Sequence, residues 1–275
     1  VGFRAEMARD WYAPMPGALL AELTEETEET EDALRLGVTT AEETLDLGSE
    51  RASLADLLAW NEAVLEGIYP TKTAGEKPPV EAISFTAGKP AAPTVSTAVP
   101  RALIPVFPGT NCEYDTQRAL REAGAKAEFF ILQNQTAEDV RRSVEGFAAA
   151  LARAQMLILP GGFSGGDEPD GSAKLITAFL RAPAVREQAE ALLQRRDGLM
   201  LGICNGFQAL IKLGLVPYGR IIDPDETCPT LTYNAIGRHQ SRIVRTRVAS
   251  NLSPWLSGVR VGEVYAVPIS HGEGR

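Results

Sequence analysis

Three side chains of this sequence could together carry out acyl transfer: the thiol of Cys204, the imidazole of His271 and the carboxylate of Glu273. Gly202 and Gly206 stand two residues before and two residues after Cys204, and they supply the space that a nucleophile on a tight strand-to-helix turn needs. A thiol paired with an imidazole base attacks a carbonyl carbon and forms a thioester. The sequence therefore predicts a cysteine-dependent site for acyl transfer.

The choice of a base is short, because the chain has only two histidines. His271 stands two residues before Glu273, and residues i and i+2 of an extended segment face the same way. We therefore expect Glu273 to orient His271 and to stabilise its imidazolium. His239, among polar and charged neighbours, is predicted to be a surface or loop residue and is the only competitor. The plainer interpretations are a buried structural cysteine and a polar, glycine-containing loop.

A glycine-rich stretch at residues 160–167 is the candidate for binding the oxyanion. It allows the N–H groups near Gly161, Gly162 and Phe163 to approach a ligand closely, together with the N–H of Asn205. A phosphate-binding loop is the alternative, but the stretch lacks a Gly-Lys-Ser/Thr ending, and a simple turn is the plainest interpretation. The other cysteines, at positions 112 and 228, lack flanking glycines and are interpreted as structural. No cysteine spacing indicates a metal site.

Short apolar runs that alternate with helical patterns must position these residues. We expect an α/β fold with a doubly wound, mostly parallel, flavodoxin-like sheet, because such runs are typical of strands covered on both faces. Ligands bind at the carboxyl edge of such sheets, and each candidate loop follows a strand. The expected strands are residues 103–107, 127–132, 156–159 and 199–203, with helices at 111–123, 136–153 (capped by Thr136), 172–181, 185–195 and 205–213, and β structure at 243–248 and 264–269.

Charge and proline content divide the chain into three parts. Residues 1–75 hold sixteen acids and five bases, and the remainder holds twenty acids and twenty-two bases, within a net charge of −9. Residues 70–100 contain six prolines, which disfavour helix and central strand. We predict a small α-rich segment at 1–75, with a helix near 53–69, a proline-rich linker at 76–100, and a catalytic domain at 101–275.

Composition excludes several classes of protein. No apolar run approaches the roughly 20 residues of a membrane helix, and no secretory signal precedes the first acidic residues. No dense basic stripe with interleaved aromatic residues indicates nucleic acid as a partner. Three cysteines without spaced pairs fit a reducing compartment, so we expect a cytoplasmic location. Because the chain starts with Val1 and stops just after the histidine motif, we expect a fragment, truncated at its C-terminus.

Several motifs of residues 101–275 resemble a known family. The stretches Gly202-Ile203-Cys204-Asn205-Gly206-Phe207-Gln208 and Ser270-His271-Gly272-Glu273-Gly274-Arg275 are similar to those of the triad-type (class I) glutamine amidotransferases. More closely, they resemble the glutaminase domain of the large, single-chain phosphoribosylformylglycinamidine synthases. Further matching stretches are residues 108–112, 161–167 and 234–242, and residues 1–75 resemble the end of the synthetase region.

The resemblance implies roles for residues of this chain. Cys204 would attack the side-chain amide of glutamine, His271 would serve as acid and base, and Glu273 would orient His271. Gln208 would help to bind glutamine, and Asn234 and Arg238 are candidates for its amino and carboxylate groups. Ammonia would pass to the synthetase region, which uses ATP and Mg²⁺ to convert formylglycinamide ribonucleotide to the amidine. This fragment itself would need no cofactor.

Two other classes of function remain open at this point. The first is a cysteine hydrolase or peptidase on a related α/β fold, although such relatives tend to place histidine directly after the cysteine, where this chain has Asn205. The second is a non-catalytic interaction domain, which would be expected to have lost a member of the Cys204, His271 and Glu273 set. The presence of all three favours the amidotransferase.

Overall fold

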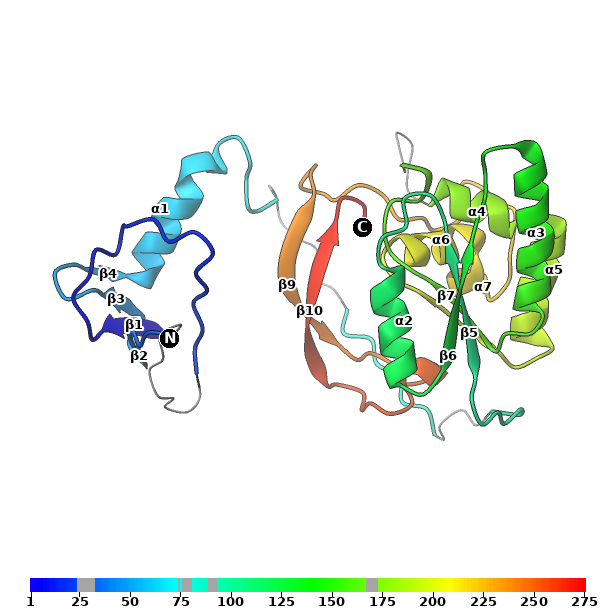
Figure 1. Ribbon diagram of the computed structural model, residues 1–275, viewed down its shortest axis with the longest axis horizontal. Helices are drawn as coiled ribbons and strands as arrows, with labels where there is room; N and C mark the ends of the chain where they lie inside the picture. Colours follow the sequence, from blue (N-terminus) through cyan, green and yellow to red (C-terminus); the bar gives the residue numbers. More distant parts are fainter. Residues whose placement is uncertain (24–32, 74, 76–80, 89–92, 167–172) are drawn as a thin grey trace. The chain divides into compact units, whose positions relative to one another are not determined.

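The computed structural model describes residues 1–275 except 24–32, 74, 76–80, 89–92 and 167–172. The chain divides into two compact units, Val1–Glu76 and Lys77–Arg275. Both units are drawn in Figure 1, and each is described by itself.

The first unit combines one helix with a small sheet. Helix α1 (Leu54–Glu66) begins after Ser53, whose hydroxyl accepts a hydrogen bond from the N–H of Asp56, as an N-cap does. The sheet has the order β2-β1-β3-β4, in which β1 runs parallel to β3 and the other pairs are antiparallel. The helix was predicted, and the four short strands were not. They are β1 (Gly2–Ala5), β2 (Gly37–Thr40), β3 (Thr44–Asp46) and β4 (Arg51–Ser53).

The second unit is built on a four-stranded sheet of order β6-β5-β7-β8, in which every neighbouring pair is parallel. This confirms the α/β fold class. The strands are β5 (Arg101–Val106), β6 (Lys126–Ile131), β7 (Met156–Leu159) and β8 (Leu199–Gly202). All four residues of β7 are buried, as expected of a central strand that is covered on both faces.

Helices cover the two faces of this sheet unequally. One face packs against α3 (Ala137–Leu151), α4 (Lys174–Leu180), α5 (Pro183–Gln194) and α6 (Asn205–Leu213), and this larger core centres on residues such as Phe147 and Leu157. The other face holds a smaller cluster around Ile104 and Ile158, against which α2 (Glu113–Glu122) packs through Leu120. Figure 1 shows α3 and α5 on one side of the sheet and α2 on the other.

The chain after the sheet forms shorter elements and a hairpin. A turn of 3-10 helix, η1 (Ser164–Gly166), follows β7, and α7 (Leu215–Tyr218) follows α6. Strands β9 (Gln240–Arg247) and β10 (Val264–His271) pair in antiparallel fashion as a separate two-stranded sheet, with η2 (Pro254–Leu256) in their connection. The indole N–H of Trp255 donates a 2.9 Å hydrogen bond to the carbonyl of Met200, so this connection is tied to β8.

The described residues of the proline-rich linker form no helix or strand, but they are bound to the second unit. Phe85 forms a β-bridge with Ser250, and its N–H donates to the carbonyl of Ala249. The Thr94 N–H and hydroxyl both donate to Asp197, at 2.6 and 2.7 Å. The linker therefore follows the surface of the second unit at two separate places.

Candidate active site

Cys204 lies on the turn between β8 and α6, with φ 50° and ψ −107°. A non-glycine residue with positive φ is strained, and this strain is typical of a nucleophile elbow. An added Cβ on Gly202 would lie 2.5 Å from the carbonyl oxygen of Gly206, and one on Gly206 would lie 2.1 Å from that of Leu159. Only hydrogen fits at both positions, so the glycines allow the turn to form and leave Cys204 exposed to solvent.

The glycine-rich loop after β7 lies directly beside this elbow. A Cβ built on Gly161 would be 3.5 Å from the Cβ of Cys204 and 3.4 Å from the sulfur of Cys112. Gly162, with φ 125°, forms a β-bridge to Thr110 in the loop that follows β5. Loops from β5, β7 and β8 thus meet at the carboxyl edge of the sheet, as the parallel strand order predicts.

The structure separates the predicted oxyanion donors. The N–H of Phe163 donates a 2.9 Å hydrogen bond to the carbonyl of Gly109, so it is not available to an oxyanion and that part of the prediction is wrong. Among the described residues, the N–H of Gly162 has no hydrogen-bond partner. Gly162, together with the N–H of Asn205 in the first turn of α6, therefore remains the candidate pair.

A chain of buried amides runs from this loop through the elbow helix. Asn205 accepts a hydrogen bond from the N–H of Ser164 at 3.3 Å and donates to the side-chain oxygen of Gln208 at 3.1 Å. Gln208 in turn donates to the main-chain carbonyl of Glu273 at 2.8 Å. Asn205 and Gln208 are 2% and 6% exposed. Because both ends of its side-chain amide hold protein partners, Gln208 is a positioning residue here rather than the glutamine contact that the resemblance implied.

His271 is the last residue of β10, where it pairs with Gln240. Its Nδ1 atom lies 2.9 Å from Oδ1 of Asn234, and its ring packs against Gly274, where an added Cβ would be 2.3 Å from Cε1. The ring is therefore hydrogen bonded to Asn234 and not to the Glu273 carboxylate, as had been expected from their spacing. The spacing argument requires an extended strand, but β10 ends at His271.

The candidate catalytic residues are linked indirectly. In the described part of the chain, no hydrogen bond joins the Cys204 sulfur to His271. The two are connected through the amides described above, because Glu273 is 9% exposed and its main chain is held by Gln208 and by a β-bridge to Tyr233.

The remaining cysteines and the second histidine occupy different places. Cys112 was interpreted as structural, but its sulfur lies beside Gly161 at the edge of the site, and burial, followed by the charge of Cys204, raises its pKa. No sequence signal near Cys112 indicated this, because the approach is made by two separate loops. Cys228 lies in a turn where its sulfur contacts Asp225, and His239 contacts the hydroxyl of Ser270 at 2.9 Å.

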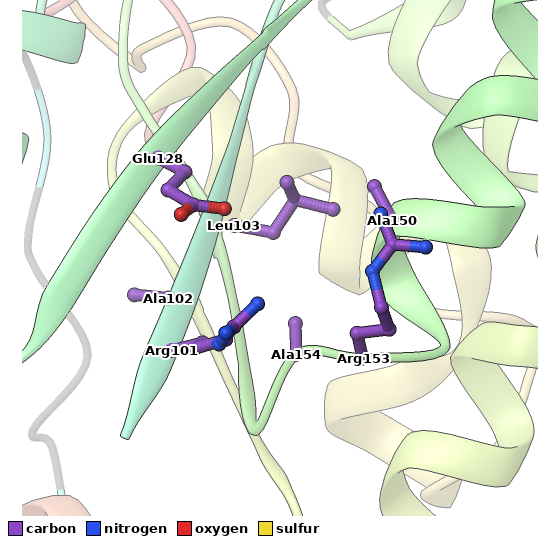
Figure 2. A pocket seen from close by; sticks show the side chains of 7 residues that line it. All are labelled: Arg101, Ala102, Leu103, Glu128, Ala150, Arg153 and Ala154. Atoms are coloured by element: carbon purple, nitrogen blue, oxygen red, sulfur yellow. The ribbon is translucent and has the colours of Figure 1, made fainter. Parts of the chain in front are cut away.

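Two hollows lie away from the elbow. Figure 2 shows a pocket of about 20 Å³, room for about one water molecule, whose lining includes Arg101 and Glu128. Arg101 begins β5, so this pocket lies at the opposite edge of the sheet from Cys204. A larger hollow of about 400 Å³ is lined by residues including Arg181 and Cys228. Neither is lined by Cys204 or His271.

Searches for other kinds of site were negative within the part of the chain that is described. No helix there is long and apolar enough to cross a membrane. The same residues contain no group of three or more His, Cys, Asp or Glu side chains that could hold a metal ion.

A parallel sheet with a strained cysteine turn at its carboxyl edge defines a class of protein, the α/β domains with a cysteine nucleophile elbow. Within this class, the chain belongs to the family of CobB/CobQ-like glutamine amidotransferase domains, which matches residues 99–275.

Similar proteins of known name support this assignment. The chain is 36% identical over 170 residues to phosphoribosylformylglycinamidine synthase subunit PurQ of Symbiobacterium thermophilum, covering 62% of this chain and 59% of that protein. It is 37% identical over 169 residues to the subunit of the same name from Pyrobaculum aerophilum, covering 62% and 65%. The chain thus spans about three fifths of the length of these relatives. Their name is that of a separate subunit, not of a large single-chain enzyme.

A solved structure is also similar to this chain. It is described as the structure of PurLQS from Thermotoga maritima, and it is 28% identical, with a TM-score of 0.47 over 64% of this chain and 68% of that chain.

Proposed function

We propose that residues 101–275 form a glutaminase that hydrolyses glutamine through a thioester on Cys204 and supplies ammonia to a phosphoribosylformylglycinamidine synthase. One observation carries this proposal. Cys204 stands exposed on a strained turn with φ 50°, directly beside the Gly161–Gly162 loop, in a chain of the glutamine amidotransferase family. Family membership provides the substrate class, and the elbow provides the nucleophile.

The reaction has two halves. His271 takes the thiol proton of Cys204, the sulfur bonds to the side-chain carbonyl carbon of glutamine, and the carbonyl electrons move to oxygen. Collapse of this intermediate breaks the carbon–nitrogen bond, and the imidazolium of His271 gives its proton to the departing ammonia. A water molecule, deprotonated by His271, then attacks the thioester and releases glutamate and the thiol. The balance is glutamine plus water giving glutamate plus ammonia.

The oxyanion formed in each half needs N–H donors at a fixed position, because such preorganised donors stabilise charge that develops in the transition state. The N–H groups of Gly162 and Asn205 are the proposed donors. The buried bond from Ser164 N–H to the Asn205 side chain supports this pairing, since it holds the loop and the helix start in register.

The proposal requires the imidazole of His271 to reach the Cys204 sulfur when glutamine is bound. Catalytic hydrogen bonds are often long or misaligned before substrate binds, so their absence here is compatible with the mechanism. The related alternative, a peptidase with its base directly after the cysteine, is not supported, because Asn205 is buried and its side chain bonds to Gln208.

The acceptor of ammonia is proposed from the resemblance and from the relatives' names. A synthetase region would use ATP and Mg²⁺ to convert formylglycinamide ribonucleotide to formylglycinamidine ribonucleotide, so the complete enzyme would be a ligase of purine biosynthesis in the cytoplasm. We infer further that glutaminase and synthetase belong to one chain. A separately folded unit, Val1–Glu76, precedes the region that matches the family and supports this inference.

Labelling by a glutamine-analogue diazo-ketone tests the glutaminase. The full chain, with its synthetase partner present, should gain one covalent label at Cys204, detected by mass spectrometry of peptides, and excess glutamine should protect it. Cys228→Ala is the matched control and should leave labelling unchanged, because that sulfur lies in a turn outside the site. A label on Cys112 or Cys228, or none, would contradict the proposal.

A second variant tests the transfer of ammonia. Cys204→Ala should abolish glutamine-dependent synthesis of the amidine, while synthesis from added ammonium salts should survive. Loss of both activities would mean that Cys204 has a structural role.

A further inference from the structure

Asn234 is the residue most closely joined to His271. Its Oδ1 lies 2.9 Å from Nδ1 of the ring, and its Nδ2 donates to the carbonyl of His271 at 2.8 Å and to that of Arg238 at 3.0 Å. The main-chain N–H of Asn234 also donates to the carbonyl of Gly272 at 2.9 Å. Asn234 is 8% exposed, so these bonds are shielded from water. One side chain thus holds both the ring and the backbone of the histidine.

The partners of Asn234 determine which way its amide points. Nδ2 faces two main-chain carbonyl oxygens, which only accept hydrogen bonds, so the group that faces them must be the NH₂. A flipped amide would place oxygen against two oxygens. Oδ1 therefore faces His271, and because an amide oxygen only accepts, Nδ1 of His271 must carry a hydrogen.

A neutral imidazole with hydrogen on Nδ1 has its free lone pair on Nε2. Nε2 is then the atom that accepts a proton from a thiol or from water. Gly274 completes the support on one face of the ring, because any larger residue there would collide with Cε1 and Nδ1. The ring is thus fixed in both tautomer and orientation.

We propose that Asn234 is the positioning residue of His271 and performs the task that the sequence assigned to Glu273. This inference rests on the glutaminase proposed above and names the third member of its catalytic set. Glu273 contributes through its main chain, whose carbonyl accepts from Gln208 and which forms a bridge to Tyr233. The arrangement of thiol, imidazole and amide requires no carboxylate to hold the tautomer.

The tautomer of His271 is directly measurable, because the chain has only two histidines. The full chain labelled with ¹⁵N-histidine would be studied by long-range proton–nitrogen correlation at a pH where both rings are neutral, and His239→Gln identifies the second ring. We expect the Nδ1–H form for His271 in the wild type and in Glu273→Gln, and loss of that preference in Asn234→Ala. Retention in Asn234→Ala, or loss in Glu273→Gln, would overturn the proposal.

Asn234→Asp separates orientation of the ring from support of the loop. It keeps an oxygen that accepts from Nδ1 but loses the two donations to carbonyls, so it should retain the Nδ1–H form even where stability falls. Equal behaviour of Asn234→Asp and Asn234→Ala in the tautomer measurement would mean that Asn234 only holds the backbone. This variant also serves if Asn234→Ala fails to fold.

Kinetics give a second readout. For glutamine hydrolysis, Asn234→Ala should lower kcat about 10- to 100-fold with little change in KM, because a base in the wrong tautomer loses proton transfer but not binding. Asn251→Ala is the matched control, since Asn251 also accepts a hydrogen bond, from the N–H of Ala87, but outside the site. An unchanged kcat in Asn234→Ala would refute the role. If wild-type Cys204 fails to label, the glutaminase proposal fails, whereas the tautomer measurement remains valid.

Discussion

The side-chain amide of Gln208 donates a 2.8 Å hydrogen bond to the main-chain carbonyl of Glu273, across 65 positions of sequence. This bond joins the helix that begins after Cys204 to the segment that carries His271. Asn205 extends the connection to the loop that holds Gly162, through its bond from the N–H of Ser164. The three parts of the site, which come from distant stretches of the chain, are therefore held together by amides rather than by charges.

Gln208→Ala should impair the site more than it impairs the fold. The change removes one partner each from the Asn205 side chain and the Glu273 carbonyl, both buried, and should cost about 1–3 kcal/mol in the free energy of unfolding. The rate of diazo-ketone labelling at Cys204 should fall as the segments separate. Gln117→Ala is the control, because Gln117 also donates to a main-chain carbonyl, that of Ala127, but away from the site. Equal labelling rates in the two variants would show that the relay does not position the site.

Gly206→Ala should prevent the elbow from forming. Its Cβ would lie 2.1 Å from the carbonyl oxygen of Leu159, which belongs to a central strand and cannot move away cheaply. We expect a loss of at least about 1–3 kcal/mol in urea unfolding, the usual cost of overpacking a core. Gly258→Ala, where nothing lies within 4 Å of the added Cβ, should be nearly neutral. A Gly206→Ala protein as stable as the Gly258→Ala protein would contradict the described turn.

The sheet and its nucleophile turn could be predicted because their signals are local. Buried parallel strands read as continuous apolar runs, and the run expected at residues 156–159 is β7 (Met156–Leu159). The expected cap at Thr136 is confirmed by a capping box with Asp139. Strands of three or four residues, such as β3 (Thr44–Asp46), are too short for periodicity to show, and they were missed.

The partners of the site residues could not be predicted, because they depend on contacts between distant segments. Asn234 lies 37 positions before His271, and nothing in the intervening sequence indicates their contact. The argument from spacing failed because the strand stops at His271, so Glu273 does not continue its face. Similarly, no local feature of Gln208 distinguishes a residue that binds substrate from one whose amide is used internally.

Cys112 should react with a haloacetamide much more slowly than Cys204 at neutral pH. Burial, followed by the charge of Cys204, raises the pKa of the Cys112 thiol, so less of the reactive thiolate is present, whereas Cys204 is exposed. In Cys204→Ala the second cause is removed, and the pKa of Cys112 should fall while remaining above its ordinary value. Alkylation rates against pH, measured by mass spectrometry, test this. An unchanged or higher pKa of Cys112 in that variant would show that Cys204 does not influence it.

The docked linker should respond to acid through Asp197. Hydrogen bonds from the N–H and hydroxyl of Thr94 lower the pKa of the Asp197 carboxyl in the folded protein. Because the folded pKa is depressed, the folded state binds fewer protons than the unfolded state between the two pKa values. The stabilisation is therefore fully present above the ordinary range of an aspartate, near pH 4, and is lost as the pH falls through the folded pKa.

Amide exchange at Thr94, corrected for its intrinsic rate, measures this coupling. In the wild type, protection should be constant from neutral pH down to about pH 4 and should decline below it, where Asp197 becomes protonated. Asp197→Asn keeps an acceptor oxygen and tolerates the backbone φ of 53°, so its protection should be weaker but independent of pH over the same range. Asp197→Gly, which also tolerates that φ, should abolish protection at every pH. Wild-type protection that follows the same pH course as in Asp197→Asn would mean that the linker is held by contacts other than this carboxylate.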